Sequence, residues 1–407
     1  MKVINNHLGF RNGHSRKQIL VSDTAEARSV FGSALFTVFE QNDFSKYDLN
    51  DPQQLPVTYR ASMARVHSDF GTWLVGDFSH ITDDGVYQAY CGNEPGPSFV
   101  IRDDVWCRVL PACIRFFQVM SCGREVVGWH DACHLDDGYL ADEDRYIDAV
   151  GGWHDAGDFR KWATSTALNA ISLLIGHRLW SGREAELGLD EGVFLREALQ
   201  GVYYFLNIQD PETGAVLQNI GGGRDTPHDN LDCRYTDNIK QSGDERRIWP
   251  GWARPPAKFT TLYAMYANAL GESDPDLARR CEAAARASVR RDRELDLHDA
   301  DSLQWRAWGY LELYRHSGDD ADRDAGVQAL GELVALQVTD HIGGQSETRG
   351  FFRAAADSEA YHHKHVGASF PVWVLAEYVE AFPAHADVSS WREAMALWVD
   401  DYALVFA

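Results

Sequence analysis

Two regimes of hydrophobic patterning divide the chain near residue 104. Before that point, short runs of β-branched and aromatic residues alternate with Gly, Asp, Asn and Pro, which is the pattern of strands joined by turns. Their spacing predicts a β-sandwich domain of about 100 residues, spanning 1–103. The runs that predict strands are 18–21, 34–39, 71–75, 86–91 and 98–102.

After residue 104, apolar positions recur every three to four residues, the period of an amphipathic helix. The connecting loops 209–256 and 339–365 are long and carry polar and aromatic residues. Loops held on a rigid scaffold are where binding residues concentrate, so we expect 104–407 to form an all-α domain with its site in these loops. Nine helices are predicted, at about 106–117, 168–179, 194–205, 257–271, 274–291, 301–317, 321–338, 366–382 and 388–407.

Composition narrows the classes of partner. The formal net charge of the 407 residues is −23, and phosphate groups and anionic membranes are bound by clustered Lys and Arg. Nucleic acid and membrane are therefore excluded, and a neutral or cationic partner is favoured. The stretch Met1–His7 lacks the apolar core of a signal peptide, so we expect a cytoplasmic protein, or alternatively a secreted one whose leader has been removed. The composition gives no prediction of the oligomeric state.

One stretch carries candidate chemistry: 151–158, Gly-Gly-Trp-His-Asp-Ala-Gly-Asp. It places Asp155 and Asp158 three residues apart on a glycine-rich turn before a predicted helix, which suits the binding of a small polar molecule. The structural alternative is that Asp155 caps the helix and Asp158 lies near its positively charged end. The residues alone leave both interpretations open.

Two cysteines and two histidines form a candidate metal group. Cys122, Cys133, His134 and His154 offer the thiol and imidazole ligands that zinc prefers, although their spacing is not that of a zinc finger. The odd total of seven cysteines favours reduced thiols or metal ligands over a framework of bridges. By residue type alone, a single disulfide or unlinked buried side chains remain alternatives.

The stretch 151–158 resembles the Asp-Ala-Gly-Asp signature of glycoside hydrolase family 9, the inverting β-1,4-glucanases. Residues 118–123 (Gln-Val-Met-Ser-Cys-Gly) and 132–138 (Ala-Cys-His-Leu-Asp-Asp-Gly) resemble the zinc-binding segment of the branch with an N-terminal Ig-like domain, and 75–87 resembles that domain. The resemblance implies an Ig-like β-sandwich followed by an (α/α)6 barrel. Such a barrel needs twelve helices, so the nine predicted here are three short.

The resemblance implies that Asp158 is the general base and that Asp155 helps to orient the attacking water. An inverting glycosidase also needs a protonated carboxylic acid, with the two carboxyl groups about 6.5–9.5 Å apart. In the family this acid is a Glu near the end of the barrel, and we find no match for it. The last glutamates, Glu377, Glu380 and Glu393, fall on amphipathic helical patterns, where we expect solvated faces. We therefore expect a chain that is short at its C-terminus relative to the family.

The resemblance also implies that Cys122, Cys133, His134 and His154 hold one structural zinc, with no position open for catalysis. Because His154 adjoins Asp155, the metal would anchor the loop that presents the base. Calcium is a further option to which the sequence assigns no residues.

Trp249, Trp252 and His365 are the candidates for substrate binding, because aromatic faces suit sugar rings and loop histidines can hydrogen-bond to hydroxyl groups. Three functions remain open. The first is inverting hydrolysis of β-1,4-glucosidic bonds in cellulose-type glucans or cello-oligosaccharides. The second is exo-β-glucosaminidase action on chitosan oligosaccharides, and the third is sugar binding by a catalytically incompetent chain that lacks the general acid.

Overall fold

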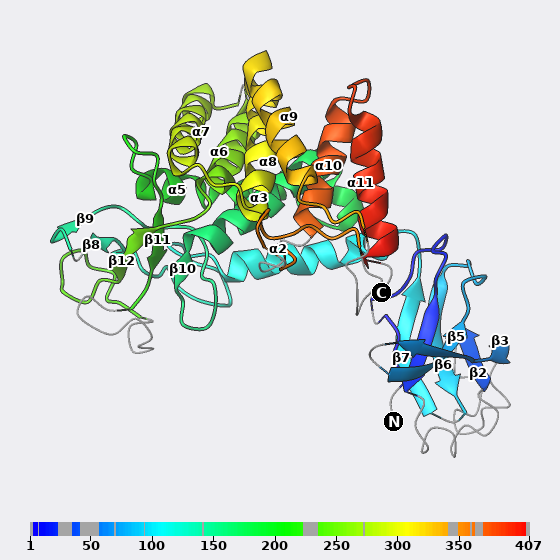
Figure 1. The fold of residues 1–407 in the computed structure, drawn as a ribbon. Coiled ribbons are helices and arrows are strands. Elements are labelled where there is room, and N and C mark those ends of the chain that lie inside the picture. Colours follow the sequence, from blue (N-terminus) through cyan, green and yellow to red (C-terminus); the bar gives the residue numbers. More distant parts are fainter. Residues whose placement is uncertain are drawn as a thin grey trace. The chain divides into compact units, whose positions relative to one another are not determined.

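The structure is a computed structural model. Its residues fall into two compact units, Met1–Cys113 and Ile114–Ala407 (Figure 1). The change in sequence pattern near residue 104 precedes this boundary, which lies inside helix α2 (Leu110–Val119). The structure describes residues 3–6, 8–22, 35–40, 57–68, 71–92, 94–140, 142–222, 235–271, 273–340, 349–358, 360–362 and 369–403.

The first unit is a sandwich of two antiparallel sheets, with strand orders β1-β5-β4 and β3-β2-β6-β7. Alternating side chains of both sheets meet in one buried cluster, to which Ile19, Phe36 and Phe99 belong. The strands are β1 (Gln18–Ser22), β2 (Leu35–Glu40), β3 (Val57–Ser62), β4 (Ala64–Ser68), β5 (Gly71–Asp77), β6 (Gly85–Cys91) and β7 (Glu94–Ile101).

All five predicted strands are present, and the structure adds β3 and β4. Both additions lie at the edge of a sheet. In β4, Ala64, Arg65, Val66 and His67 are all exposed, so this strand carries no alternation of buried and exposed residues. A search for alternating hydrophobicity therefore passes over it.

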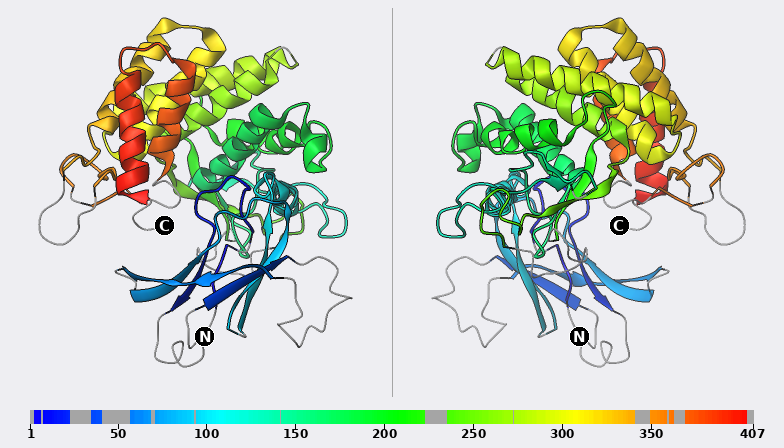
Figure 2. Two further views of the ribbon diagram at one scale, coloured as in Figure 1. Left: turned by 90° about the vertical axis from the view of Figure 1, so that its right-hand side faces the viewer. Right: turned by 90° about the vertical axis from the view of Figure 1, so that its left-hand side faces the viewer.

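The second unit is a set of packed helices, and α7, α8 and α9 each begin at a capping aspartate. Asp274, Asp299 and Asp319 each accept a backbone N–H of the first turn that follows, at 2.9 to 3.1 Å, as N-cap residues do. Helices α10 and α11, orange and red in Figure 1 and Figure 2, lie side by side. No helix in the described ranges is long and apolar enough to cross a membrane.

The helix predicted at 194–205 is two helices, α4 and α5, with Gly201 between them. A Cβ atom at Gly201 would lie 2.6 Å from the buried ring of Trp153, so close packing requires glycine there, and glycine is a poor helix former. The helices are α2, α3 (Ala163–Trp180), α4 (Val193–Leu199), α5 (Val202–Ile208), α6 (Pro256–Leu270), α7 (Pro275–Leu295), α8 (Ala300–Ser317), α9 (Asp320–Val334), α10 (Phe370–Ala381) and α11 (Val388–Asp401), with 3-10 helices at Cys107–Val109 and Glu184–Leu187.

A small mixed sheet also belongs to the second unit, which the sequence had predicted to be all-helical. Its order is β10-β11-β12-β8-β9. Most of its strands are only two to four residues long, too short for a period of two to be read from the sequence. The strands are β8 (Tyr139–Leu140), β9 (Arg145–Tyr146), β10 (Lys161–Trp162), β11 (Leu217–Ile220) and β12 (Arg247–Trp252).

Candidate functional site

Asp155 and Asp158 lie on a tight turn that ends where β10 begins. The N–H of Asp155 donates to the carbonyl of Arg160 at 2.7 Å, and Phe159 adopts a left-handed φ of 58°. Helix α3 begins only at Ala163, and neither carboxylate caps it or lies in its first turn. The capping interpretation of this stretch is therefore wrong, and the two acids are left for another role.

Both carboxylates are accessible, and one of them is held in place. Asp155 is exposed, and the side chain of Asp158 is 31% exposed. Arg160, which is buried, places Nε 3.3 Å from Oδ2 of Asp158 and donates its backbone N–H to Oδ1 at 3.3 Å. Contacts to both oxygens fix the orientation of this carboxylate toward solvent.

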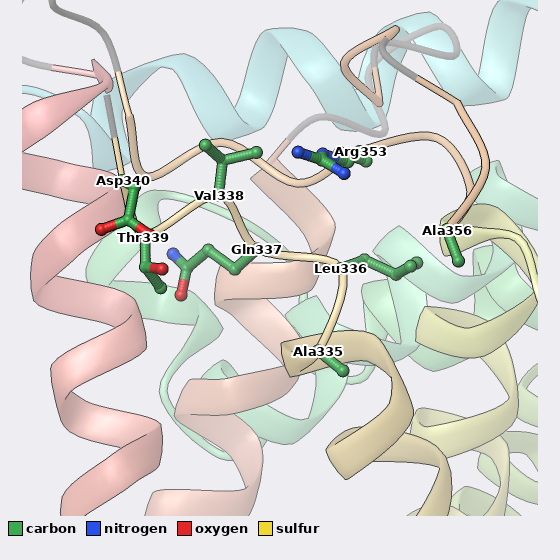
Figure 3. Close-up of a pocket in the computed structure, with 8 residues that line it drawn as sticks. All are labelled: Ala335, Leu336, Gln337, Val338, Thr339, Asp340, Arg353 and Ala356. Carbon is green, nitrogen blue, oxygen red and sulfur yellow. The ribbon is translucent and has the colours of Figure 1, made fainter. Parts of the chain in front are cut away.

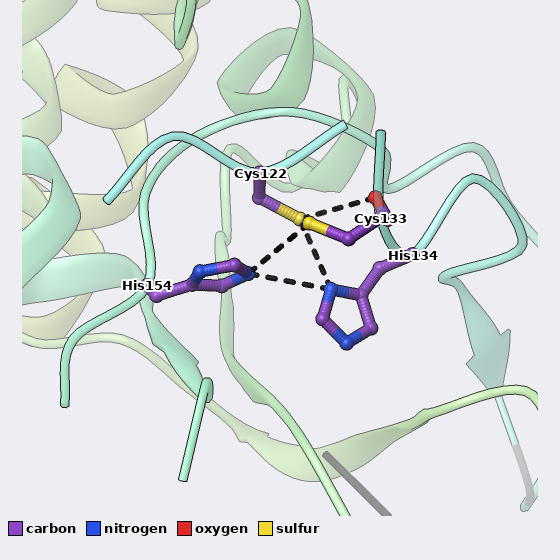
Figure 4. Close-up of side chains that lie close together, drawn as sticks. All are labelled: Cys122, Cys133, His134 and His154. Atoms are coloured by element: carbon purple, nitrogen blue, oxygen red, sulfur yellow. Dashed lines mark hydrogen bonds between the residues drawn. The ribbon is translucent and has the colours of Figure 1, made fainter. Parts of the chain in front are cut away.

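Cys122, Cys133, His134 and His154 point toward one another in one compact group (Figure 4), with their ligand atoms all within 4.8 Å. The two imidazole nitrogens are 3.3 Å apart, and each lies 3.8 Å from a sulfur atom. A tetrahedral zinc with bonds of about 2.0–2.3 Å spaces its ligand atoms about 3.3–3.8 Å apart. The four residues therefore fit one zinc ion.

The protonation states of this group also suit a metal. A hydrogen bond from Cys122 lowers the pKa of the Cys133 thiol to about 7, and burial lowers the pKa of His154. Thiolate and neutral imidazole are the forms that bind metal ions. These protonation states therefore favour the binding of a metal cation at neutral pH.

The metal group packs directly against the turn. The ring of Phe159, the residue after Asp158, stacks on His154 with centroids 4.8 Å apart and an angle of 21°. The backbone N–H of His154 donates to the backbone carbonyl of Met120 at 2.8 Å. Phe159 also meets the ring of His134 edge to face, with centroids 6.3 Å apart, so two aromatic contacts connect the metal group to the turn.

A buried charge network, missed from the sequence, supports the same turn. Asp137 accepts two hydrogen bonds from Arg246, at 2.7 and 2.6 Å, and forms an ion pair with Lys161 at 2.8 Å. Arg246 also donates to the carbonyl of Phe159 at 2.5 Å. Although burial acts to raise it, the charges of Arg246 and Lys161 hold the pKa of Asp137 well below its usual range.

Asp137→Asn should lower the free energy of unfolding by about 3–5 kcal/mol, because it leaves two buried cations without their partner. Since folding depresses the pKa of Asp137, the wild-type advantage should be present above about pH 4 and decline as pH falls below that value. Denaturant titration at several pH values measures both effects. Asp190→Asn, at an exposed position, is the control and should change stability by less than about 0.5 kcal/mol; an equal effect of the two substitutions would contradict the prediction.

Both tryptophans predicted to bind substrate lie on the small sheet, whose strand β10 begins where the Asp155–Asp158 turn ends. Trp249 and Trp252 lie on β12, which pairs with β11, and β11 pairs with β10. The indole N–H of Trp249 donates to the carbonyl of Gly221 at 2.5 Å, and the Arg247 guanidinium lies 4.6 Å from its ring centre. Trp252 is 45% exposed and is the more open aromatic surface. His365 lies outside the described residues.

The glutamates near the end of the chain differ from one another. Glu380 and Glu393 are exposed, as expected. Glu377 is buried, which contradicts the prediction of a solvated face, because ion pairs with Arg178 at 2.7 Å and Arg315 at 2.9 Å compensate its charge. A binary hydrophobic pattern cannot distinguish a paired buried charge from a solvated one.

A pocket of about 480 Å³ opens beyond the end of α9 (Figure 3). Figure 3 shows the charged side chains of Asp340 and Arg353 on opposite sides of it. None of the predicted catalytic residues lines this pocket. Its lining residues are Ala335, Leu336, Gln337, Val338, Thr339, Asp340, Arg353 and Ala356.

Comparison with known proteins relates this architecture to one family. Residues 106–302 match the model of glycosyl hydrolase family 9. A cellodextrinase of Butyrivibrio fibrisolvens is 27% identical over 188 residues, which are 44% of this chain and 31% of the relative. A solved variant of the thermostable endoglucanase from Alicyclobacillus acidocaldarius aligns with a TM-score of 0.64 at 19% identity, over 96% of this chain and 69% of that one. A solved Zn-binding triple mutant of family 9 endoglucanase J30 aligns with the same TM-score at 20% identity, over 97% and 71%.

The chain therefore has the fold of solved family 9 endoglucanases. Its residues 106–302 resemble glycoside hydrolase family 9, which confirms the resemblance of the Asp-Ala-Gly-Asp turn. The matches span about a third of the length of the curated relatives.

Proposed function

We propose that this protein is an inverting hydrolase of β-1,4-glucosidic bonds in cellulose-type glucans or cello-oligosaccharides. The observation that carries the proposal is the turn at Asp155 and Asp158, whose carboxylates are accessible and cap no helix. The turn lies within the residues that match the family model. A cellodextrinase is among the relatives of the chain.

In the proposed reaction, Asp158 removes a proton from a water molecule as its oxygen attacks the anomeric carbon. Asp155 accepts a hydrogen bond from the same water and orients it. The glycosidic bond breaks on the opposite face. A sugar leaving group must take a proton there from a carboxylic acid, a role to which no residue of this chain is assigned, whereas fluoride departs without a proton. The configuration at the anomeric carbon is inverted, so a β-linked substrate yields an α-product.

The metal group has a structural role in this proposal. Cys122, Cys133, His134 and His154 would hold a zinc ion whose four protein ligands leave no site for substrate. The ion would supply folding free energy, and the stack of Phe159 on His154 would convey the resulting order to the turn. The fold shared with the Zn-binding mutant of endoglucanase J30 supports this role.

We also propose that the two units are an Ig-like domain and an (α/α)6 barrel. The sandwich has sheets of three and four strands, the division found in Ig-like domains. The fold shared with family 9 endoglucanases supports the barrel. The sandwich would serve in packing and folding, because its large aromatic side chains Phe36, Phe78, Tyr87 and Phe99 are buried inside it.

The proposal is tested with β-cellobiosyl fluoride, whose leaving group departs without a proton, so that the test isolates the base. Proton NMR should show α-cellobiose as the first product. Formation of β-cellobiose, or no hydrolysis above the rate in buffer, would contradict the mechanism.

Parallel assays on cello- and chitosan oligosaccharides identify the substrate class. The net charge of −23 gives a cationic substrate a specific attraction, so an exo-β-glucosaminidase is the second candidate function. Release of glucosamine from chitosan oligosaccharides without cleavage of cello-oligosaccharides would replace the first function by the second.

A further inference from the structure

The loop between Cys122 and Cys133 carries two exposed apolar side chains at its tip. Val127 is 81% exposed and Trp129 is 62% exposed. Tryptophan contributes most to stability when its large ring is buried, so this ring contributes little to the fold. Large apolar side chains that gather on a surface mark sites of interaction with another molecule.

Backbone hydrogen bonds hold the tip in one conformation. Gly128 adopts a left-handed φ of 81°, and the N–H of Trp129 donates to the carbonyl of Val126 at 2.9 Å, as in a tight turn. His130 exchanges two backbone hydrogen bonds with Val126 and places its Nε2 3.0 Å from the carbonyl of Val119 in α2. The tip is therefore ordered before a ligand arrives, which lowers the entropic cost of binding.

Arg115 of α2 orients the tryptophan without burying it. Its guanidinium lies 5.5 Å from the ring centre of Trp129, and its Nη2 donates to the carbonyl of Val127 at 3.4 Å. Because Trp129 keeps 62% of its surface exposed, the arginine covers only a part of the indole. The remaining ring surface is open to a ligand.

A hollow of about 300 Å³ adjoins this arginine. Its lining holds both donors and acceptors of hydrogen bonds: Arg115 donates to Oε1 of Gln118 at 3.3 Å, and Nε2 of Gln118 donates to Glu197 at 3.2 Å. Glu197 also pairs with Arg124. The positive charges of Arg115 and Arg124 balance the negative charges of Glu125 and Glu197, which complete the polar lining.

The chemistry of this surface favours a neutral ligand that is rich in hydroxyl groups. A lining with balanced charges attracts neither a polyanion nor a polycation, although the chain as a whole has a net charge of −23. Side chains that donate and accept suit hydroxyl groups, which do both. The axial C–H bonds of a β-linked glucose ring form a flat apolar face, which can pack against an indole.

We propose that Trp129 and the adjoining hollow bind a neutral β-1,4-glucan chain, with one sugar ring on the indole and hydroxyl groups of the next ring bonded to the polar lining. None of these residues belongs to the turn that carries Asp158 or to the small sheet of β8 to β12. The site would therefore raise the concentration of glucan near the enzyme and take no part in bond cleavage. The choice of a β-1,4-glucan rests on the proposed function, whereas the choice of a neutral sugar rests on the site itself.

The test is binding of the full chain to amorphous cellulose, measured by depletion of protein from solution. Asp158→Asn serves as the parent, so that hydrolysis does not consume the cellulose. Adding Trp129→Ala should raise the dissociation constant at least about threefold, the loss expected for one aromatic contact. Adding Trp129→Phe should restore most of the affinity, because a flat ring remains.

Two controls separate loss of the site from a disturbed fold. Trp106→Ala removes a tryptophan that is 41% exposed and lies outside the hollow, and it should bind cellulose as the parent does. In the chain that keeps Asp158, Trp129→Ala should hydrolyse β-cellobiosyl fluoride at the wild-type rate and keep the wild-type Tm, because this small substrate needs no accessory site and the ring is exposed.

Unchanged cellulose binding by Trp129→Ala, or an equal loss in Trp106→Ala, would overturn the proposal. Sedimentation in which Trp129→Ala abolishes self-association while cellulose binding stays intact would make the tip a contact between two copies and would also overturn it. Binding that depends on Trp129 in a chain that fails to hydrolyse the fluoride would support this site and contradict the proposed hydrolase function.

Discussion

Asp158→Asn should lower the turnover of β-cellobiosyl fluoride by about 10²–10⁴-fold, which is the usual contribution of a general base. Asparagine has the size of aspartate but cannot take a proton from water. The amide oxygen can still accept the backbone N–H of Arg160, as Oδ1 of Asp158 does at 3.3 Å, so KM should change little. Steady-state kinetics on this fluoride measure kcat and KM separately.

The pH profile distinguishes loss of a base from a general disturbance of the turn. In Asp158→Asn, the acidic limb of kcat/KM against pH should disappear, because that limb reports titration of the base in the free enzyme. Asp155→Asn should lower turnover as well but retain the limb, since the base remains. Asp190→Asn should leave the kinetics unchanged. Turnover by Asp158→Asn within a few-fold of the wild type would remove Asp158 from the role of base.

Purified protein should contain about one equivalent of zinc, and Cys133→Ser should lose most of it together with much of the stability of the second unit. The free energy of binding at a structural zinc site is folding free energy, about 10–16 kcal/mol in zinc-finger peptides. Because the pKa of Cys133 is about 7, protons compete with the metal increasingly as pH falls below that value. Elemental analysis and thermal unfolding at pH 8 and pH 5 measure both effects.

Cys113→Ser is the matched control for this experiment. Cys113 is a free, exposed cysteine outside the metal group, so its substitution should change neither zinc content nor Tm. Metal-free protein in which mass spectrometry finds a disulfide between Cys122 and Cys133 would refute the zinc site.

The helices and most strands of the sandwich were predictable because their signals are local. The period of apolar residues, and capping residues such as Asp274 and Asp299, can be recognised from a few neighbouring positions in the sequence. The metal group was different, because Cys122 and His154 are 32 residues apart and their spacing matches no general metal motif. The residue types made these four side chains candidates, and the resemblance to the family favoured zinc over the alternatives.

The supporting charges were not predictable, for a physical reason. Asp137, Lys161 and Arg246 are polar residues that hydrophobic patterns place on the surface, and they are buried only because they neutralise one another. Glu377 was mistaken for a solvated residue for the same reason. The short strands β8 to β10 were also missed, because two residues cannot show a period. Pairing across the fold, and not local sequence, determines all these features.

His134, Asp136 and Asp137 occupy a span of four residues, yet each faces a different partner: the Cys–His group, Thr236, and Arg246 with Lys161. A segment whose neighbouring side chains serve separate contacts tolerates single exchanges better than a change in length. One residue inserted or deleted here would shift all three side chains out of register together. The number of residues in this segment is therefore constrained in addition to the identities of its side chains.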